Sequence, residues 1–112
     1  MSVPVALDDL GATLASYPWG FFVTVGDDLR AHSLAVPTRF RDGALHASVG
    51  RSTLANITAR PDVTMVFPHP TAGEYSLILD GVAAVVVDDT VVGDAVVFTP
   101  SSAVLHRPAI AT

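Results

Sequence analysis

The most telling stretch of the chain is residues 44–61, ALHASVGRSTLANITARP. A strand-like run leads through Gly50 into a helix-like run that Pro61 stops. Backbone N–H groups in the first turn of a helix have no partner within the helix, and the helix dipole places its positive end there. This junction is therefore a place where a protein can hold an anion such as phosphate.

Three polar side chains stand at the start of the predicted helix. Arg51 offers charge-assisted donors, and Ser52 and Thr53 offer hydroxyl groups. A second interpretation is purely structural, because serine commonly caps the first turn of a helix. The residues alone leave both interpretations open, a phosphate-holding turn or a helix capped by Ser52.

Length and composition indicate a single domain that covers residues 1–112. Half of the residues are hydrophobic and only 15% are charged, an unusual balance for a small domain that stands alone. We therefore expect part of the apolar surface to be shared with a second subunit.

Charge and hydropathy exclude two classes of partner. The net charge of −5 and the pI near 5.0 argue against nucleic acid, whose protein partners normally carry a basic stripe. The longest clear apolar run, Val82 to Val87, is too short to span a bilayer, and residues 1–10 lack the pattern of a signal peptide. We expect a soluble cytoplasmic protein with no membrane partner.

Missing residue types exclude further chemistry. The chain has no cysteine, which rules out thiolate catalysis, disulfides and cysteine-ligated metals. All six cationic residues are arginine, so no lysine is present to form a Schiff base or a Walker motif. The four histidines show no metal-binding spacing, and no metal site is predicted. No acid, base or nucleophile stands out, so catalytic residues are not assigned.

Periodicity and turn residues predict a β-rich domain. Pro37 marks an edge, a bulge or a strand end, and Gly81 marks a bend in a long strand. The tail from Pro100 is predicted to form a short strand with a mobile end from about residue 108. The predicted elements are a helix at 5–16, strands at 19–25, 29–40 and 44–49, a helix that ends before Pro61, and strands at 62–67, 75–87 and 91–99.

The order of these elements resembles a known family. The run from Leu45 to Pro61, followed by residues 63–68 (VTMVFP), is similar to the pyridoxamine 5'-phosphate oxidase-like split-barrel proteins. In that family a strand, a phosphate-holding turn, a short helix and another apolar strand follow in the same order. The strand from Tyr75 to Ala83, with its central glycine, is similar to the family's next strand. We expect a mainly β fold, a six-stranded antiparallel split β-barrel with one or two short helices.

The resemblance implies a homodimer that binds flavin mononucleotide (FMN), or in some branches the deazaflavin coenzyme, in two clefts between the subunits. It places the cofactor phosphate at one turn, the cofactor edge along one strand, the flavin ring beside a second strand, and one polar contact on a third. The residues that correspond are Arg51, Ser52 and Thr53 for the turn, His46, Ala47 and Ser48 for the edge, Val36, Pro37 and Thr38 for the ring, and Ser76 for the polar contact.

One departure from the family concerns charge. The pyridoxamine oxidases carry an Arg-Lys pair where this chain has Ser52-Thr53, which leaves Arg51 as the one cation of the turn. A second cation would have to come from Arg39, Arg60 or Arg107. The role of the His106-Arg107 tail stays open between an exposed strand end and a reach into the partner's cleft.

Two functions follow from these patterns. The first is a flavin- or deazaflavin-dependent oxidoreductase that acts on an unidentified small molecule, since a flavin carries its own hydride chemistry and needs no obvious catalytic constellation. The second is a non-catalytic dimeric split-barrel binding domain that has lost tight cofactor binding. The retained Gly-Arg-Ser-Thr turn favours the first, and the missing cations favour the second.

Overall fold

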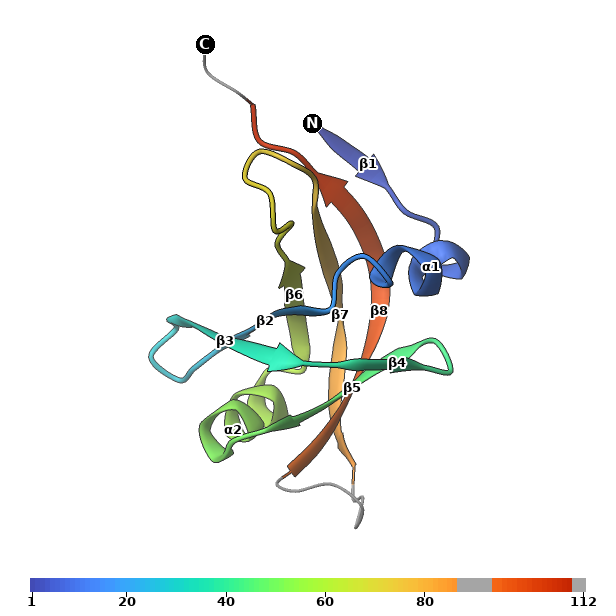
Figure 1. Cartoon of the computed structure of the whole chain (residues 1–112). Helices are drawn as coiled ribbons and strands as arrows, with labels where there is room; N and C mark the ends of the chain where they lie inside the picture. Colours follow the sequence, from blue (N-terminus) through green and yellow to red (C-terminus); the bar gives the residue numbers. More distant parts are fainter. Residues whose placement is uncertain (87–93, 110–112) are drawn as a thin grey trace.

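The computed structural model describes residues 1–86 and 94–109 (Figure 1). Its helices and strands are, in chain order, β1 (Ser2–Pro4), the 3-10 helix η1 (Leu7–Asp9), α1 (Leu10–Leu14), β2 (Trp19–Val25), β3 (Ala31–Pro37), β4 (Arg39–Arg41), β5 (Ala44–Val49), α2 (Arg51–Ala59), β6 (Asp62–Phe67), β7 (Ser76–Val86) and β8 (Asp94–His106).

The strands form one antiparallel sheet whose order is β3-β2-β6-β7-β8-β5-β4, with β1 added beside β8. The two strands at the ends of this order, β3 and β4, follow one another in the chain with only Thr38 between them. This single-residue connection brings the two edges of the sheet together. The sheet therefore curls into an incompletely closed barrel.

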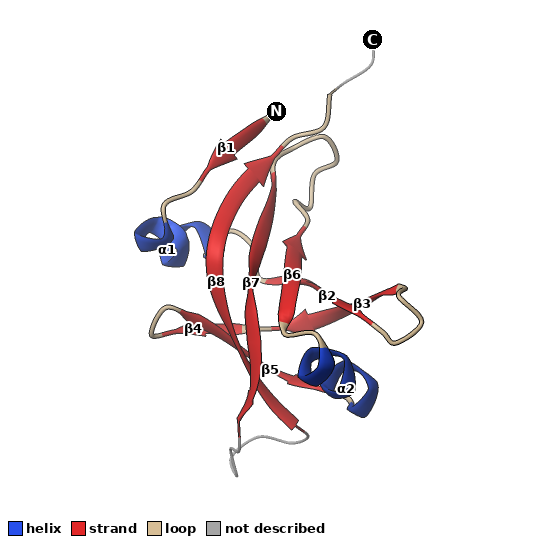
Figure 2. Cartoon of the chain, turned by 180° about the vertical axis from the view of Figure 1, so that it is seen from behind, coloured by secondary structure: helices blue, strands red, loops and turns tan. Residues whose placement is uncertain are grey.

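The long strands β7 and β8 form the spine of the barrel. Figure 2 shows them side by side through the molecule, with α1 and α2 on opposite sides of the pair. The lower part of β8 pairs with β5, and its upper part pairs with β1 (Figure 1). The two strands thus link the two ends of the molecule.

The mainly β fold is confirmed, but the predicted strand number is wrong. The part of the chain that the structure describes has eight strands rather than six. The predicted strand at 29–40 is divided, because Leu29 has a positive φ of 62° in the turn and Thr38 interrupts the ladder after Pro37. Of the three alternatives predicted for Pro37, an edge, a bulge or a strand end, the structure shows a strand end, since Pro37 is the last residue of β3. The other additional strand, β1, has only three residues, too few for a periodic pattern.

The first helix is shorter than the predicted span of 5–16. The backbone N–H of Val5 donates to the carbonyl of Ala103 at 2.9 Å, so the chain is still extended beside β8 at this point. The predicted apolar face is confirmed at Leu10 and Leu14, which are buried, whereas Leu7 is 45% exposed.

The last strand is longer than predicted. β8 continues through Pro100 to His106, where the sequence predicted a break and a separate short strand. Pro100 is accommodated because it lies opposite Gly81, at a register shift between Asp80 and Gly81 that confirms the predicted bend. Val87 and residues 91–93 of the predicted strands lie outside the described residues, as do residues 110–112 of the predicted mobile end. Pro108 and Ala109 have no regular structure.

The core fills the concave face of the sheet. The rings of Phe22 and Phe98 meet edge to face with centroids 6.1 Å apart. The largest side chains with less than 2% exposure come from the strands and both helices. They are Phe22, Phe67, Phe98, Leu10, Leu45, Ile57, Met65, Leu77, Leu79 and Val96.

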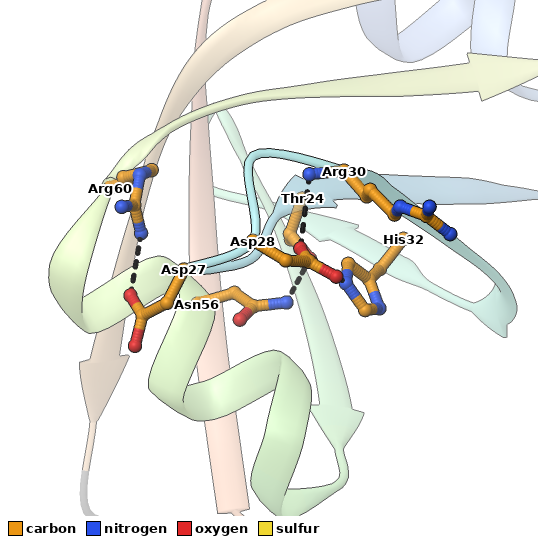
Figure 3. Close-up of polar contacts among 7 residues, drawn as sticks. All are labelled: Thr24, Asp27, Asp28, Arg30, His32, Asn56 and Arg60. Atoms are coloured by element: carbon orange, nitrogen blue, oxygen red, sulfur yellow. Dashed lines mark hydrogen bonds and ion pairs between the residues drawn. The ribbon is translucent and has the colours of Figure 1, made fainter.

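Polar contacts fix α2 against the β2–β3 hairpin (Figure 3). Asn56 donates from Nδ2 to Oγ1 of Thr24 at 3.1 Å, and Thr24 is 1% exposed. Near the helix end, Arg60 forms an ion pair of 3.1 Å with Asp27. These contacts set the position of the whole helix, including its first turn.

The hairpin turn has its own electrostatic anchor (Figure 3). Asp28 accepts a hydrogen bond from the backbone N–H of Arg30 at 3.0 Å and lies 3.6 Å from the His32 ring nitrogen. The Arg30 N–H, followed by His32, holds the pKa of the Asp28 carboxyl below its ordinary value. The turn that faces α2 is therefore held in its shape by a carboxylate that stays ionised.

Substitution of Gly81 by alanine tests the bend. A Cβ at residue 81 would collide with the carbonyl oxygen of Thr99 and lie 2.9 Å from Cα of Pro100, so backbone would have to move. We expect Gly81→Ala to lower the free energy of unfolding by at least about 2 kcal/mol, measured by urea denaturation. Gly50→Ala is the matched control, because a Cβ there meets nothing within 4 Å and should cost less than about 1 kcal/mol. Equal losses in the two variants would contradict the role given to Gly81.

Candidate functional site

A cavity of about 290 Å³ opens on the outer face of the sheet, beside the junction of β3 and β4. One wall is apolar and the other carries arginine and histidine side chains. The cavity is lined by Pro37, Thr38, Arg39, Arg41, His46, Ala47, Ser48, Val86, Ala95 and Val96.

Strand register explains how these residues come together. Arg39 of β4 lies directly opposite His46 of β5, and Arg41 shares the face of Arg39 because side chains alternate along a strand. On the neighbouring strands Ser48, Ala95 and Val86 form one cross-strand row. With Pro37 of β3, the site is thus built from five strands that meet at one end of the barrel.

Half of the residues predicted for cofactor contact line this cavity. They come from the end of β3 and from β5, segments that the sequence alone could not place side by side. The five residues are Pro37, Thr38, His46, Ala47 and Ser48.

The predicted phosphate turn follows directly after β5 at the start of α2. Gly50 is the N-cap residue, and its carbonyl accepts the first helical hydrogen bond from Leu54 at 3.0 Å. Among the described residues no side chain caps the helix start, so the structural interpretation of Ser52 as the cap is wrong. Arg51 and Ser52 are exposed, whereas Thr53 is buried with 4% exposure. Exposed side-chain donors at this turn come from Arg51 and Ser52.

Two predicted residues lie away from the cavity within one chain. Val36 is 7% exposed and faces the core, on the opposite side of β3 from the lining residue Pro37. Ser76 begins β7 and Val86 ends it, a separation of roughly 33 Å at about 3.3 Å per residue. Ser76 could therefore join a site near Val86 only in a second subunit.

The arginines considered as a second cation for the cofactor phosphate fall into two groups. Arg39 lines the cavity, as does Arg41, which the sequence analysis did not single out. A sequence signal for Arg41 does exist. It is the placement of two arginines at alternate positions of a short strand that ends in a turn at Asp42 and Gly43. Arg60 instead pairs with Asp27, and Arg107 donates from Nε to the carbonyl of Gly73 at 3.0 Å.

A polar cluster holds the far end of the barrel together. The guanidinium of Arg107 lies 5.7 Å from the ring centroid of Tyr75, whose carbonyl accepts a 2.7 Å hydrogen bond from the hydroxyl of Tyr17. Burial, and then the charge of Glu74, raises the pKa of the Tyr17 hydroxyl. Ser2 and His106 also meet here, at 3.0 Å. These contacts tie β1, β8 and the loop before β7 together, and none of their residues lines the cavity.

The outer face beside the cavity is apolar. Val82 and Val86 of β7 are 47% and 38% exposed, and Ala84 between them lies opposite Val97 of β8. Exposed apolar patches of this kind commonly mark interaction surfaces. The patch continues directly into the apolar wall of the cavity through Val86.

Two features are absent from the part of the chain that the structure describes. No helix in the described part of the chain has the length and apolar character needed to cross a membrane. Across residues 1–86 and 94–109, no three histidine, aspartate or glutamate side chains gather in a way that would hold a metal ion.

Comparisons with known proteins relate the chain to both sequences and structures. No protein-family model matches it. Uncharacterized proteins of Mycobacterium bovis and Mycobacterium tuberculosis are each 35% identical to this chain, in an alignment that covers 94% of this chain and 82% of the relative.

Solved structures show the same fold at low identity. A Clostridium acetobutylicum protein related to general stress protein 26, of the pyridoxinephosphate oxidase family, is similar with a TM-score of 0.71 and 14% identity, over 90% of this chain and 87% of that one. An FAD-binding protein from Mycobacterium smegmatis is similar with a TM-score of 0.69 and 16% identity, over 94% and 98%. The chain therefore belongs to the family of the two mycobacterial proteins, and its fold is the split barrel of the pyridoxamine 5'-phosphate oxidase-like proteins.

Proposed function

We propose that the chain forms a homodimer that binds FMN, or alternatively the deazaflavin coenzyme, and acts as an oxidoreductase on a small molecule. The observation that carries the proposal is the position of the cavity. Three of its lining residues, His46, Ala47 and Ser48, lie on β5, the strand that leads directly into the exposed first turn of α2.

The apolar wall suits a flat ring system. Val86 presents exposed aliphatic surface, Ala95 lies beside it in the same cross-strand row, and the exposed Pro37 closes the wall at the end of β3. Cofactor sites typically combine such apolar surface with a few placed polar groups. A flavin ring on this wall would leave its polar edge toward the side of the cavity that carries His46 and Ser48.

The first turn of α2 suits the cofactor phosphate. Backbone N–H groups in the first turn have no partner within the helix, and in the part of the chain that the structure describes no side chain caps them. Arg51 and Ser52 are both exposed beside them, so one cation and one hydroxyl supplement the helix end.

Cavity size supports a site completed by a second subunit. At about 290 Å³ the cavity is at the low end of the roughly 300–1,000 Å³ usual for ligand sites. The exposed patch of Val82, Ala84 and Val86 continues from its edge. A partner that covers this patch would also roof the cavity and exclude water from it.

A bound flavin supplies hydride transfer at its ring, which is why the chain needs no acid, base or nucleophile of its own. The residues of the chain bind and orient. The apolar wall would support the flat face of the ring, and His46 and Ser48 of β5 would offer polar contacts to its edge.

One observation favours the alternative, a non-catalytic dimeric binding domain without tight cofactor binding. Thr53 occupies one of the two positions where the pyridoxamine oxidases carry a cation, and its side chain is buried. The turn therefore offers a phosphate a single cation, Arg51, and that cation is exposed to solvent.

Titration of the purified protein with FMN, and separately with the deazaflavin coenzyme, distinguishes the two functions. We expect a saturable change in the visible absorption spectrum with one of them, because transfer of the ring from water to the apolar wall alters its surroundings. Riboflavin, which lacks the phosphate, is the matched ligand control and should bind more weakly than FMN. Absence of saturation with both cofactors would support the binding domain.

Arg51→Ala tests the phosphate turn. Loss of a hydrogen bond to a charged group costs about 1.5–3 kcal/mol, so we expect FMN affinity to fall by roughly 10- to 150-fold and riboflavin affinity to stay the same. Arg30→Ala is the control, since Arg30 is an equally exposed arginine on the β2–β3 turn. Unchanged FMN affinity in Arg51→Ala would place the phosphate elsewhere.

Val82→Asp tests the subunit interface. We expect the wild-type protein to be a dimer at micromolar concentration in light scattering, and Val82→Asp to be a monomer because a charge would be buried without a partner. Leu29→Asp introduces the same charge at a residue that is 76% exposed, on the β2–β3 turn, and should leave the dimer intact. A wild-type monomer would remove the second subunit from the proposed site.

A further inference from the structure

We propose that Arg39, Arg41 and His46 form a second anion subsite, separate from the turn of α2, which binds a carboxylate or phosphate group of the substrate. This inference rests on the proposed function, and it names the class of small molecule that the site would accept. All three residues line the cavity.

The three side chains are arranged to reach one anion. Arg39 and His46 are direct cross-strand neighbours, whose Cβ atoms are about 4.5–5.5 Å apart in an antiparallel pair. Arg41 follows on the same face of β4, roughly 7 Å further along the strand. Both guanidinium groups and a ring nitrogen of His46 can donate to oxygen atoms placed between them.

The positive charge of Arg39 and Arg41 stands out against the acidic character of the whole chain. The protein has a net charge of −5, yet two of its six arginines line this one cavity. The described lining residues include no aspartate or glutamate. Two like charges on the same face of one short strand repel each other, and a bound anion would relieve that repulsion.

The positions of Arg39 and Arg41 along β4 separate the proposed subsite from the turn that would hold the cofactor phosphate. Arg39 pairs with His46, four residues before Gly50, and Arg41 pairs with Ala44, six residues before it. At about 3.3 Å per residue, these pairs lie roughly 13 and 20 Å along β5 from the start of α2. A phosphate held at the start of α2 would therefore lie far from Arg41 along β5. If the cofactor phosphate lies at α2, Arg39 and Arg41 lie on the side of the cavity away from that phosphate. A substrate would bind on this side.

The two exposed arginines make the subsite open to substitution without loss of the fold. Both belong to a three-residue strand at the edge of the sheet, and neither contributes to the buried core. The double variant Arg39→Gln/Arg41→Gln removes the charge and keeps similar side-chain length. Arg39→Lys/Arg41→Lys keeps the charge and loses the forked geometry.

Titration with inorganic phosphate, followed by calorimetry, tests the subsite directly. All proteins carry Arg51→Gln, so that the turn of α2 contributes less to phosphate binding. We expect saturable phosphate binding to the Arg51→Gln protein, a loss of at least about tenfold on addition of Arg39→Gln/Arg41→Gln, and partial recovery with the lysine pair. Addition of Arg30→Gln, on the β2–β3 turn, should leave the phosphate affinity unchanged. Equal affinity in all of these proteins, or no saturable binding, would overturn the subsite.

A second measurement distinguishes the substrate from the cofactor as the source of the anion. In a protein that retains Arg51, Arg39→Gln/Arg41→Gln should leave FMN and riboflavin affinities unchanged. A selective loss of FMN affinity would show that these arginines hold the cofactor phosphate, and would overturn the assignment to a substrate. Phosphate binding at the wall in a protein that binds no flavin would refute the proposed cofactor and leave the anion subsite standing.

Discussion

The architecture depends on the close approach of β7 and β8 at Gly81. The Thr99 carbonyl and the Phe98 ring occupy the space that any side chain at residue 81 would need. The register shift at this point lets both strands bend, so that one half of β8 pairs with β5 and the other half with β1. The same shift accommodates Pro100 within a strand. Without this contact the two halves of the sheet could not share their long strands.

The site follows from the way in which the sheet closes. Thr38 alone separates β3 from β4, so the strands at the two ends of the sheet order are held side by side. This geometry brings Pro37 to the same cavity as Val86 and Ala95, which lie much later in the sequence. The Thr24–Asn56 hydrogen bond and the Arg60–Asp27 ion pair then fix α2 beside it. The position of the helix start is thus set by contacts at residues that the ligand would not touch.

Local patterns predicted much of the fold. Alternating apolar residues located β2, β5 and β6 at their observed bounds, and Pro37 and Gly81 marked a strand end and a bend. Two features depend on tertiary contacts and could not be predicted in this way. β1 exists because β8 offers it an edge, and β8 continues past Pro100 because Gly81 faces it.

The candidate site was predictable to a similar extent. Family order grouped five residues that the structure brings to one cavity, because the order of strands determines which of them are neighbours, and their contact with a cofactor stays a prediction. Arg41 was missed because its importance comes from register, since it shares a face with Arg39 and lies opposite Ala44. The burial of Thr53 was equally invisible, because a helix start in isolation does not reveal which of its side chains faces a core.

The two arginines of β4 also affect how molecules meet in solution. β4 is an edge strand, and an edge with free backbone groups can pair with the same edge of another molecule. In such a pairing the arginines of one copy would approach those of the other, and their repulsion would oppose it. The two arginines of this edge would therefore also oppose aggregation. Substitution of both by neutral residues would be expected to reduce solubility.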